Sequence, residues 1–260
     1  RTKVLLVDHR PRWEFRYLKN LFADRDKTVK LQYVLLDPDH VAGRLERHKI
    51  HASASRPLGQ VEATALPESE EEWLKFDVVI LGDVPPAALE KKDAEALHKF
   101  VVERGGTLVV IAGPSYMPHA YGDSLLAEVL PVTFEPSKQA LFQAPEPQYR
   151  FALSAEGRQD VILRQKVDPA ENREVWDALP PLYWRHAVKE AKPGATVLAY
   201  AVPPDAPDYI PRPRGAGAEA PEPASAPTPD ETDPETLAKR RRFERTHPLL
   251  VRQSGGMGQV

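Results

Sequence analysis

Three stretches of polar side chains follow apolar runs in the first half of the chain, and each contains groups that do chemistry. They are 8–14 (DHRPRWE), 82–83 (GD) and 113–121 (GPSYMPHAY). In open α/β sheets, ligands bind beyond the carboxyl ends of the strands, where the winding of the chain reverses. We therefore expect the three stretches to line one crevice. The expected ligand-binding residues are Asp8, Arg10, Arg12, Trp13, Glu14, Asp83, Ser115, Tyr116 and His119.

Ser115 is a candidate nucleophile, with His119 four residues later as its base. A serine nucleophile needs an adjacent base and a third group that orients the base. Gly113 fits the first position of a Gly-x-Ser-x-Gly elbow, but Met117 does not fit the last. The simpler interpretation is that Ser115 caps a turn or a short helix. The enzymatic alternative is a Ser115-based hydrolase or an acid/base reaction at Asp8, Asp83 and His119.

Arg10 and Arg12 precede an expected helix, and both guanidinium groups and free helix N–H groups favour anions. This arrangement predicts a site for a carboxylate or a phosphate. The structural alternative is that Glu14 or Asp83 pairs with an arginine of this stretch while Trp13 packs against the sheet. Either arrangement allows a small anionic ligand or a partner peptide to bind at the crevice.

Asp8 and Asp83 lie at the ends of strands that we expect to be neighbours, and together they could form a paired-carboxylate or Mg²⁺ site. An aspartate at the end of a parallel strand is also a routine cap. The turn at 113–121 adds no third acidic residue, and the eight histidines show no metal-ligand spacing such as H-E-x-x-H. We expect neither a metal nor a cofactor.

The elements that position these residues follow a strand–helix alternation. Short apolar, β-branched runs predict buried parallel strands, and apolar residues at helical spacing predict the helices between them. The pattern is that of an α/β fold with a three-layer α/β/α arrangement and a flavodoxin-like, doubly wound, mostly parallel sheet. Strands are expected at 3–8, 29–36, 76–84 and 107–112, and helices from residue 11, over 89–104 and near 123–130.

The rest of the chain is less regular. Residues 40–70 are expected to form a long loop, and late strands and an edge hairpin of the same domain are expected near 141–142, 149–153 and 195–202. Residues 203–234 contain ten prolines, a composition that predicts a disordered insertion. A charged helix is expected at 235–245. It is followed by a strand at 248–253 that is expected to rejoin the sheet. The expected organisation is a domain over 1–202, the insertion at 203–234, and a returning segment of the same domain at 235–260.

Composition limits the function classes. With 42% hydrophobic residues, 28% charged residues and a net charge of −3, the chain has no overall field that attracts nucleic acid or an anionic membrane. The absence of cysteine excludes disulfides, thiolate metal sites and a thiol nucleophile. We found neither a long apolar run nor a signal peptide in the sequence, so we expect a soluble domain. Because the chain begins at Arg1 and stops within a glycine turn, we expect it to be a piece of a longer polypeptide.

Five stretches of the chain together resemble a known family. They are DHRPRWEFRYLKN, FDVVILGDV, RGGTLVVIAGPSYMPHAYG, KPGATVLAY and PLLVRQSGGMG. The resemblance is to the glutamine amidotransferase-like domain of large bacterial membrane proteins, which often also carry BatA-like and von Willebrand factor A-like segments. It covers most of the chain outside the proline-rich insertion.

The resemblance implies a class I amidotransferase-like fold without that class's chemistry. Active members carry a cysteine on the turn after a central strand, where this chain has Gly113-Pro114-Ser115. The His-Pro-Glu tripeptide of active members is matched only by His247-Pro248-Leu249, which lacks the acid. The resemblance therefore implies a non-catalytic module of a membrane-anchored bacterial protein, and its expected partner is a protein or a small anionic ligand.

Overall fold

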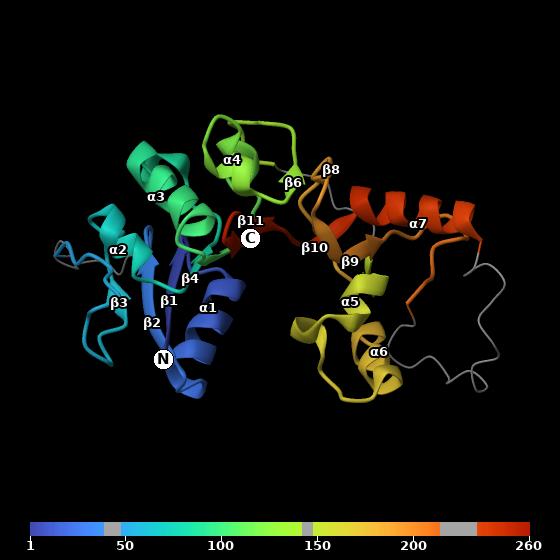
Figure 1. Ribbon diagram of the computed structural model, residues 1–260, viewed down its shortest axis with the longest axis horizontal. Helices are drawn as coiled ribbons and strands as arrows, with labels where there is room; N and C mark the ends of the chain where they lie inside the picture. Colours follow the sequence, from blue (N-terminus) through green and yellow to red (C-terminus); the bar gives the residue numbers. More distant parts are fainter. Residues whose placement is uncertain (39–47, 142–147, 214–232) are drawn as a thin grey trace. The chain divides into compact units, whose positions relative to one another are not determined.

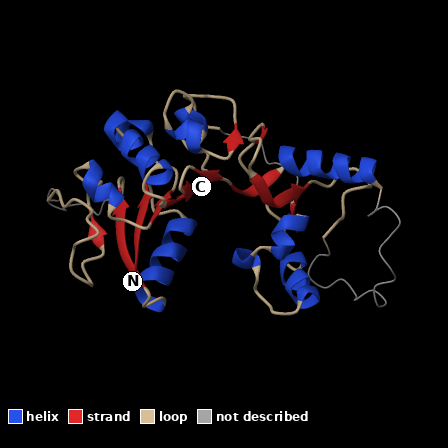
Figure 2. Cartoon of the chain, viewed as in Figure 1, coloured by secondary structure: helices blue, strands red, loops and turns tan. Residues whose placement is uncertain are grey.

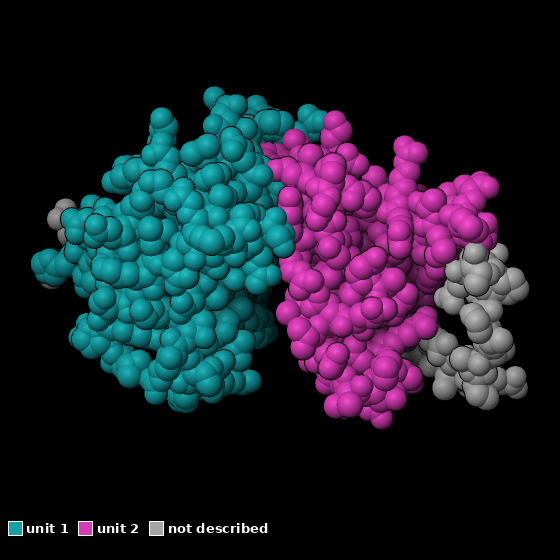
Figure 3. All heavy atoms as spheres, viewed as in Figure 1, with its two compact units in different colours: residues 1–130, 135–142, 254–260 teal, residues 131–134, 143–253 magenta. Residues whose placement is uncertain are grey.

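The computed structural model describes residues 1–38, 48–141, 148–213 and 233–260 (Figure 1). The chain divides into two compact units (Figure 3). Unit 1 comprises residues 1–130, 135–142 and 254–260, and unit 2 comprises residues 131–134 and 143–253. Across the described residues, no helix has the length and apolar character needed to cross a bilayer.

Unit 1 is built on a seven-stranded sheet with the order β11-β12-β5-β4-β1-β2-β3. All of its strands run parallel except β11, which pairs antiparallel with β12. The fold is thus an α/β fold with a mostly parallel sheet. The strands are β1 (Thr2–Asp8), β2 (Val29–Leu35), β3 (Glu62–Ala63), β4 (Val78–Leu81), β5 (Thr107–Val110), β11 (Ser254–Gly255) and β12 (Gly258–Gln259).

Helices cover both faces of this sheet because its central strands are apolar on both sides. In β1, Val4 and Leu6 pack in one cluster with Phe15 of α1 (Trp13–Asn20). Leu5 and Val7 pack in another cluster, which includes α3 (Lys91–Val102). Successive side chains of a strand point to opposite faces, which accounts for this division. The remaining helices of unit 1 are α2 (Glu70–Leu74), α4 (Leu126–Val129), η1 (Leu21–Arg25), η2 (Pro86–Ala88) and η3 (His119–Tyr121).

The winding of unit 1 reverses between β1 and β4. From β1 the chain adds β2 and then β3 on one side, whereas β4 and β5 lie on the other side. The registers Leu6↔Ile80 and Val7↔Leu81 bring the carboxyl ends of β1 and β4 together. Asp8 ends β1, and Asp83 follows β4 by two residues, so both lie at the position where this class of sheet binds ligands.

Unit 2 contains small antiparallel sheets (Figure 2). One has the order β10-β9-β7, and the other pairs β6 with β8. The segments Asp168-Pro169 and Asp233-Pro234 begin α6 and α7, because each aspartate caps backbone N–H groups and proline fits the first helical turn. The elements are β6 (Val132–Thr133), β7 (Arg150–Leu153), β8 (Glu190–Ala191), β9 (Thr196–Val202), β10 (Pro248–Arg252), α5 (Ala155–Gln159), η4 (Val161–Leu163), α6 (Pro169–Asp177) and α7 (Pro234–Thr246).

The structure confirms the four main strands, α1, α3, α7 and β9. The expectation that the strand at 248–253 rejoins the parallel sheet is wrong. It forms β10, which lies antiparallel to β9, and β9 also pairs antiparallel with β7. Within the described residues, the chain returns to the main sheet at β11 and β12. Residues 40–70 are also more than a loop, since they include β3 and the start of α2, although 39–47 lie outside the described residues.

The proline-rich segment is described only in part, and 214–232 lie outside the described residues. Within 203–213, Ala206 and Ile210 are buried in the same cluster as Tyr200 and Phe243. Phe142 lies outside the described residues as well, so the strand expected at 141–142 stays a prediction. The division into 1–202, 203–234 and 235–260 also stays a prediction.

Candidate functional site

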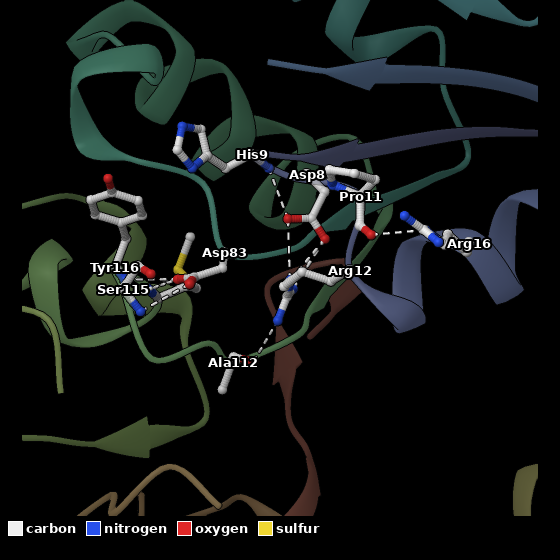
Figure 4. Close-up of polar contacts among 10 residues, drawn as sticks. Asp8, His9, Pro11, Arg12, Arg16, Asp83, Ala112, Ser115 and Tyr116 are labelled. Atoms are coloured by element: carbon white, nitrogen blue, oxygen red, sulfur yellow. Dashed lines mark hydrogen bonds and ion pairs between the residues drawn. The ribbon is translucent and has the colours of Figure 1, made fainter. Parts of the chain in front are cut away.

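The end of β1 carries an ion pair between a buried aspartate and a partly buried arginine (Figure 4). Asp8 is 1% exposed, and its carboxylate oxygens accept hydrogen bonds from Arg12 Nε at 3.3 and 3.1 Å. The main-chain N–H of His9 donates to Asp8 Oδ1 at 2.8 Å. Arg12 Nη1 also donates to the carbonyl oxygen of Ala112 at 3.3 Å, which ties the end of β1 to the chain after β5.

The ion pair sets the electrostatics of this end of the sheet. Burial raises the pKa of Asp8 above its ordinary value, while the charge and hydrogen bonds of Arg12 and the N–H groups of His9 and Asp83 act against burial. Arg12 Nη2 lies 3.1 Å from Asp8 Oδ2 without hydrogen-bond geometry, so this contact is one of charge alone. Most polar contacts of the Arg12 side chain are therefore with the Asp8 carboxylate.

Gly82 is required by the packing of this pair. A Cβ at position 82 would lie 2.3 Å from Asp8 Oδ2 and 2.8 Å from Arg12 Nη2. Both distances are well inside van der Waals contact, so any larger residue would displace the pair. A glycine at a strand end commonly marks such a close approach.

Asp83 organises the turn that follows β5. Its Oδ2 accepts the main-chain N–H of Ser115 at 2.9 Å, and its Oδ1 accepts those of Tyr116 at 2.7 Å and Met117 at 2.8 Å. The carboxylate is 4% exposed and packs against Gly113, where a Cβ would lie 2.2 Å from Asp83 Cγ. Asp83 is thus the cap of the 113–117 turn.

Ser115 and His119 are close, but they are not arranged as a nucleophile and its base. His119 is 1% exposed, and its Nε2 lies 3.2 Å from the main-chain oxygen of Ser115. Among the described residues, the Ser115 hydroxyl makes no hydrogen bond to His119 or Asp83. The N–H groups at the start of this turn, which an oxyanion hole would use, are bound to Asp83.

The arginines pair with partners other than the expected ones. Arg10 Nε donates to Asp37 Oδ2 at 3.1 Å, and Arg12 pairs with Asp8. Glu14, on the exposed side of α1, makes no ion pair within the described part of the chain. The expectation that Glu14 or Asp83 holds an arginine is therefore wrong. Asp8 and Asp37 hold the arginines instead, because Asp8 ends β1 and Asp37 lies just beyond β2, and the ends of these adjacent strands lie side by side.

The expectation that Trp13 packs against the sheet is also wrong. Trp13 and Tyr17 are 69% and 70% exposed, and their rings stack at a centroid distance of 6.0 Å. The Arg16 guanidinium lies 5.7 Å from the centroid of the Trp13 ring, and its Nε donates to the carbonyl of Pro11 at 3.0 Å. Phe15 takes the buried face of α1 instead. We call Trp13, Arg16 and Tyr17 the α1 surface.

The structure therefore brings some of the predicted residues together through three contacts. Asp8 and Arg12 form the ion pair, Asp83 holds the backbone of Ser115 and Tyr116, and the Tyr116 ring meets His9 edge-on at 5.5 Å. Sequence reasoning missed Asp37, Gly82 and Tyr17. The position of Asp37 just after the strand at 29–36 matched that of Asp8 after its own strand and was the available clue.

The carboxylates at the strand ends are already engaged. Asp8 is held by a guanidinium group and Asp83 by three backbone N–H groups. Within the described ranges, no group of three or more histidine, aspartate or glutamate side chains is placed to hold a metal ion. The arrangement stabilises two loops at the edge of a sheet.

Comparison of the chain with protein-family models and with curated protein sequences gives no match. The structure shows an α/β fold with a mostly parallel sheet in unit 1 and small antiparallel sheets in unit 2.

Proposed function

We propose that the chain is a non-catalytic, glutamine amidotransferase-like module of a larger membrane-anchored bacterial protein and that it binds a protein partner. Apart from the two-residue strands β3 and β11 at its edges, the sheet has the order β2-β1-β4-β5-β12, which follows the 2-1-3-4-5 order of flavodoxin-like sheets. Helices on both faces of that sheet are in keeping with a three-layer α/β/α arrangement. Both features support the amidotransferase-like assignment made from the sequence.

The observation that carries the non-catalytic part is the engagement of Asp83 by three backbone N–H groups. A nucleophile at position 115 would need an activating base and N–H groups directed at a developing oxyanion. In this chain the turn gives those N–H groups to Asp83, and His119 faces a carbonyl oxygen of the turn. This arrangement supports binding over turnover.

The α1 surface supports a protein partner. Tryptophan, tyrosine and arginine are the residue types most often found at the energetic centres of protein interfaces. Trp13, Arg16 and Tyr17 present all three types on one exposed helix face. Residues 1–30 carry nine Lys and Arg against four Asp and Glu, whereas the whole chain has a net charge of −3. This local positive charge favours an acidic segment of a partner protein.

A labelled acidic peptide tests the binding part of the proposal. We expect saturable binding by fluorescence anisotropy, and we expect Trp13→Ala with Tyr17→Ala to weaken it about tenfold. Val161→Ala is the matched control, since Val161 is 70% exposed and lies in unit 2. If the control and the double variant bind equally well, the α1 surface is not the binding surface.

Activity measurements test the non-catalytic part. We expect no glutamine hydrolysis above a buffer control and no labelling of Ser115 by a fluorophosphonate probe. Labelling that disappears in Ser115→Ala would favour the alternative, a Ser115-based hydrolase. Because the peptide experiment does not depend on this result, the two parts of the proposal can fail separately.

A further inference from the structure

Three arginine side chains line one cavity in unit 2, together with Tyr200 and Trp176. Arg158 lies in α5, Arg173 in α6, and Arg212 in the segment that follows β9. These residues belong to three separate segments of the chain, and the fold of unit 2 brings them to one cavity. The other lining residues are Ala152, Leu153, Asp177, Pro211 and Pro213.

The positive charge of the cavity is only partly balanced. Arg173 Nε lies 3.6 Å from Asp177 Oδ2. Arg212 donates from Nη1 to the carbonyl of Pro204 and from Nη2 to that of Ala206, both at 3.0 Å, and these neutral acceptors fix its orientation without neutralising it. Among the described residues, the Arg158 guanidinium has neither a hydrogen bond nor an ion pair. Three lining cations thus face one lining carboxylate.

A second acidic residue near the cavity, Glu244, is only partly ionised. Glu244 acts electrostatically on both Tyr200 and Arg158 but lines a different cavity, with Glu156. Burial, with a contribution from Glu156, raises the pKa of Glu244 to about 7. Its carboxyl group is therefore partly protonated near neutral pH, and the excess positive charge persists around Arg158.

Tyr200 supplies a hydrogen-bond donor at the same cavity. It is 2% exposed, and its hydroxyl makes no hydrogen bond to another described residue. Burial raises the pKa of Tyr200 to about 12, so the hydroxyl stays protonated at neutral pH. The hydroxyl is therefore available to donate a hydrogen bond to a ligand in the cavity.

We propose that this cavity binds the dianionic phosphate group of a small phosphate monoester that carries an apolar or aromatic group. Guanidinium forks match the oxygens of a phosphate, and three of them beside a hydroxyl donor suit its tetrahedral acceptors. Trp176 offers a fixed ring for the organic part, because its Nε1 donates to Leu163 at 2.8 Å and its ring stacks on Phe151 at 5.2 Å. The cavity lies apart in sequence from the α1 surface and does not depend on the proposed function.

Isothermal titration of the full chain with phenyl phosphate and with inorganic phosphate, at neutral pH and low salt, tests the site. We expect both probes to bind and phenyl phosphate to bind several-fold more tightly. Arg158→Gln should weaken phenyl phosphate about tenfold or more, since a charge-assisted contact is lost. Arg164→Gln is the matched control, an exposed arginine of the same unit that does not line the cavity, and should bind like the unmodified chain.

Tyr200→Phe separates the hydroxyl from the packing of its ring against Phe243. We expect this variant to stay folded by near-UV circular dichroism and to bind phenyl phosphate roughly threefold to tenfold more weakly. The proposal is overturned if the unmodified chain gives no saturable heat with phenyl phosphate up to about 10 mM. Equal affinities of Arg158→Gln and Arg164→Gln, or equal affinities of the two probes, would also overturn it.

Discussion

The strand ends of unit 1 and the cavity of unit 2 both gather charged side chains, but they differ in what those charges contact. In unit 1, Asp8 is matched by Arg12, and Asp83 is matched by three backbone N–H groups. In unit 2, Arg158 has no ion pair among the described residues, and the Tyr200 hydroxyl has no hydrogen bond there. The difference indicates that charged groups with partners inside the protein stabilise the fold. Charged and polar groups without such partners are available to bind a ligand.

Removal of Asp83 should have the largest effect on stability. Asp83→Ala leaves three backbone N–H groups of the 113–117 turn without their acceptor, two of them on Tyr116 and Met117. We expect the free energy of unfolding of unit 1 to fall by about 3–5 kcal/mol in urea titrations. Asp37→Ala is the control, because its pair with Arg10 is exposed, and it should cost less than about 1 kcal/mol. Equal losses would remove the distinction between a structural and a surface carboxylate.

A methyl group at position 82 should cause the second-largest loss of stability. Gly82→Ala places a Cβ 2.3 Å from Asp8 Oδ2, and we expect this overpacking to cost about 2–3 kcal/mol. Gly59→Ala serves as the control, since a Cβ there meets nothing within 4 Å and the variant bears only the strain of φ +88°, about 1 kcal/mol. A Gly82→Ala protein as stable as Gly59→Ala would show that the Asp8–Arg12 pair is loosely held.

The buried carboxyl group of Glu244, in unit 2, should make the free energy of unfolding depend on pH. Because the pKa of Glu244 is raised from 4.5 to about 7 in the folded chain, the unfolded chain ionises first as pH rises. Stability should therefore fall between those two pH values, and Glu244→Gln should abolish that part of the fall. We expect the variant to gain about 2 kcal/mol relative to the unmodified chain between acidic and mildly alkaline pH. A constant difference across that range would mean that the pKa of Glu244 is the same in the folded and the unfolded chain.

The smallest effect on stability is expected at the α1 surface. Trp13→Ala and Tyr17→Ala remove side chains that are about 70% exposed, so each should change the free energy of unfolding by no more than about 0.5 kcal/mol. Phe15→Ala, on the buried face of the same helix, should cost about 3 kcal/mol or more. Chemical denaturation of the three variants measures this contrast, and a large loss at Trp13 would assign it a role in folding.

The parallel core of the fold could be predicted from the sequence because its strands are continuous apolar runs. The runs at 3–8 and 107–112 correspond to β1 and β5. The sequence could not show that unit 2 forms sheets separate from the main sheet. Its strands β6 and β8 contain two residues each, too few to show an alternation of apolar and polar side chains. Its α6 had a usable signature, an aspartate followed by proline at Asp168-Pro169, which matches that of α7.

The sequence predicted where the candidate site lies but not which groups its residues contact. Strand ends pointed to Asp8 and Asp83, since the carboxyl ends of parallel strands meet at one edge. Sequence spacing could not show that Asp83 would take backbone N–H groups from a turn 32 residues later. It also could not place Trp13, because helical spacing alone left open which stripe of α1 faces the sheet, and Phe15 occupies that stripe.

A double-mutant cycle on Asp8 and Arg12 tests most directly whether the strand-end charges of unit 1 serve the fold. The cycle uses Asp8→Asn, Arg12→Met and the double variant, with urea unfolding as the measurement. Because the Asp8 carboxylate is buried and Arg12 is partly buried, we predict a coupling free energy of about 2–4 kcal/mol, against about 0.5 kcal/mol for the exposed Arg10–Asp37 pair. A coupling no larger than that of the exposed pair would contradict the account and reopen the crevice as a binding or catalytic site.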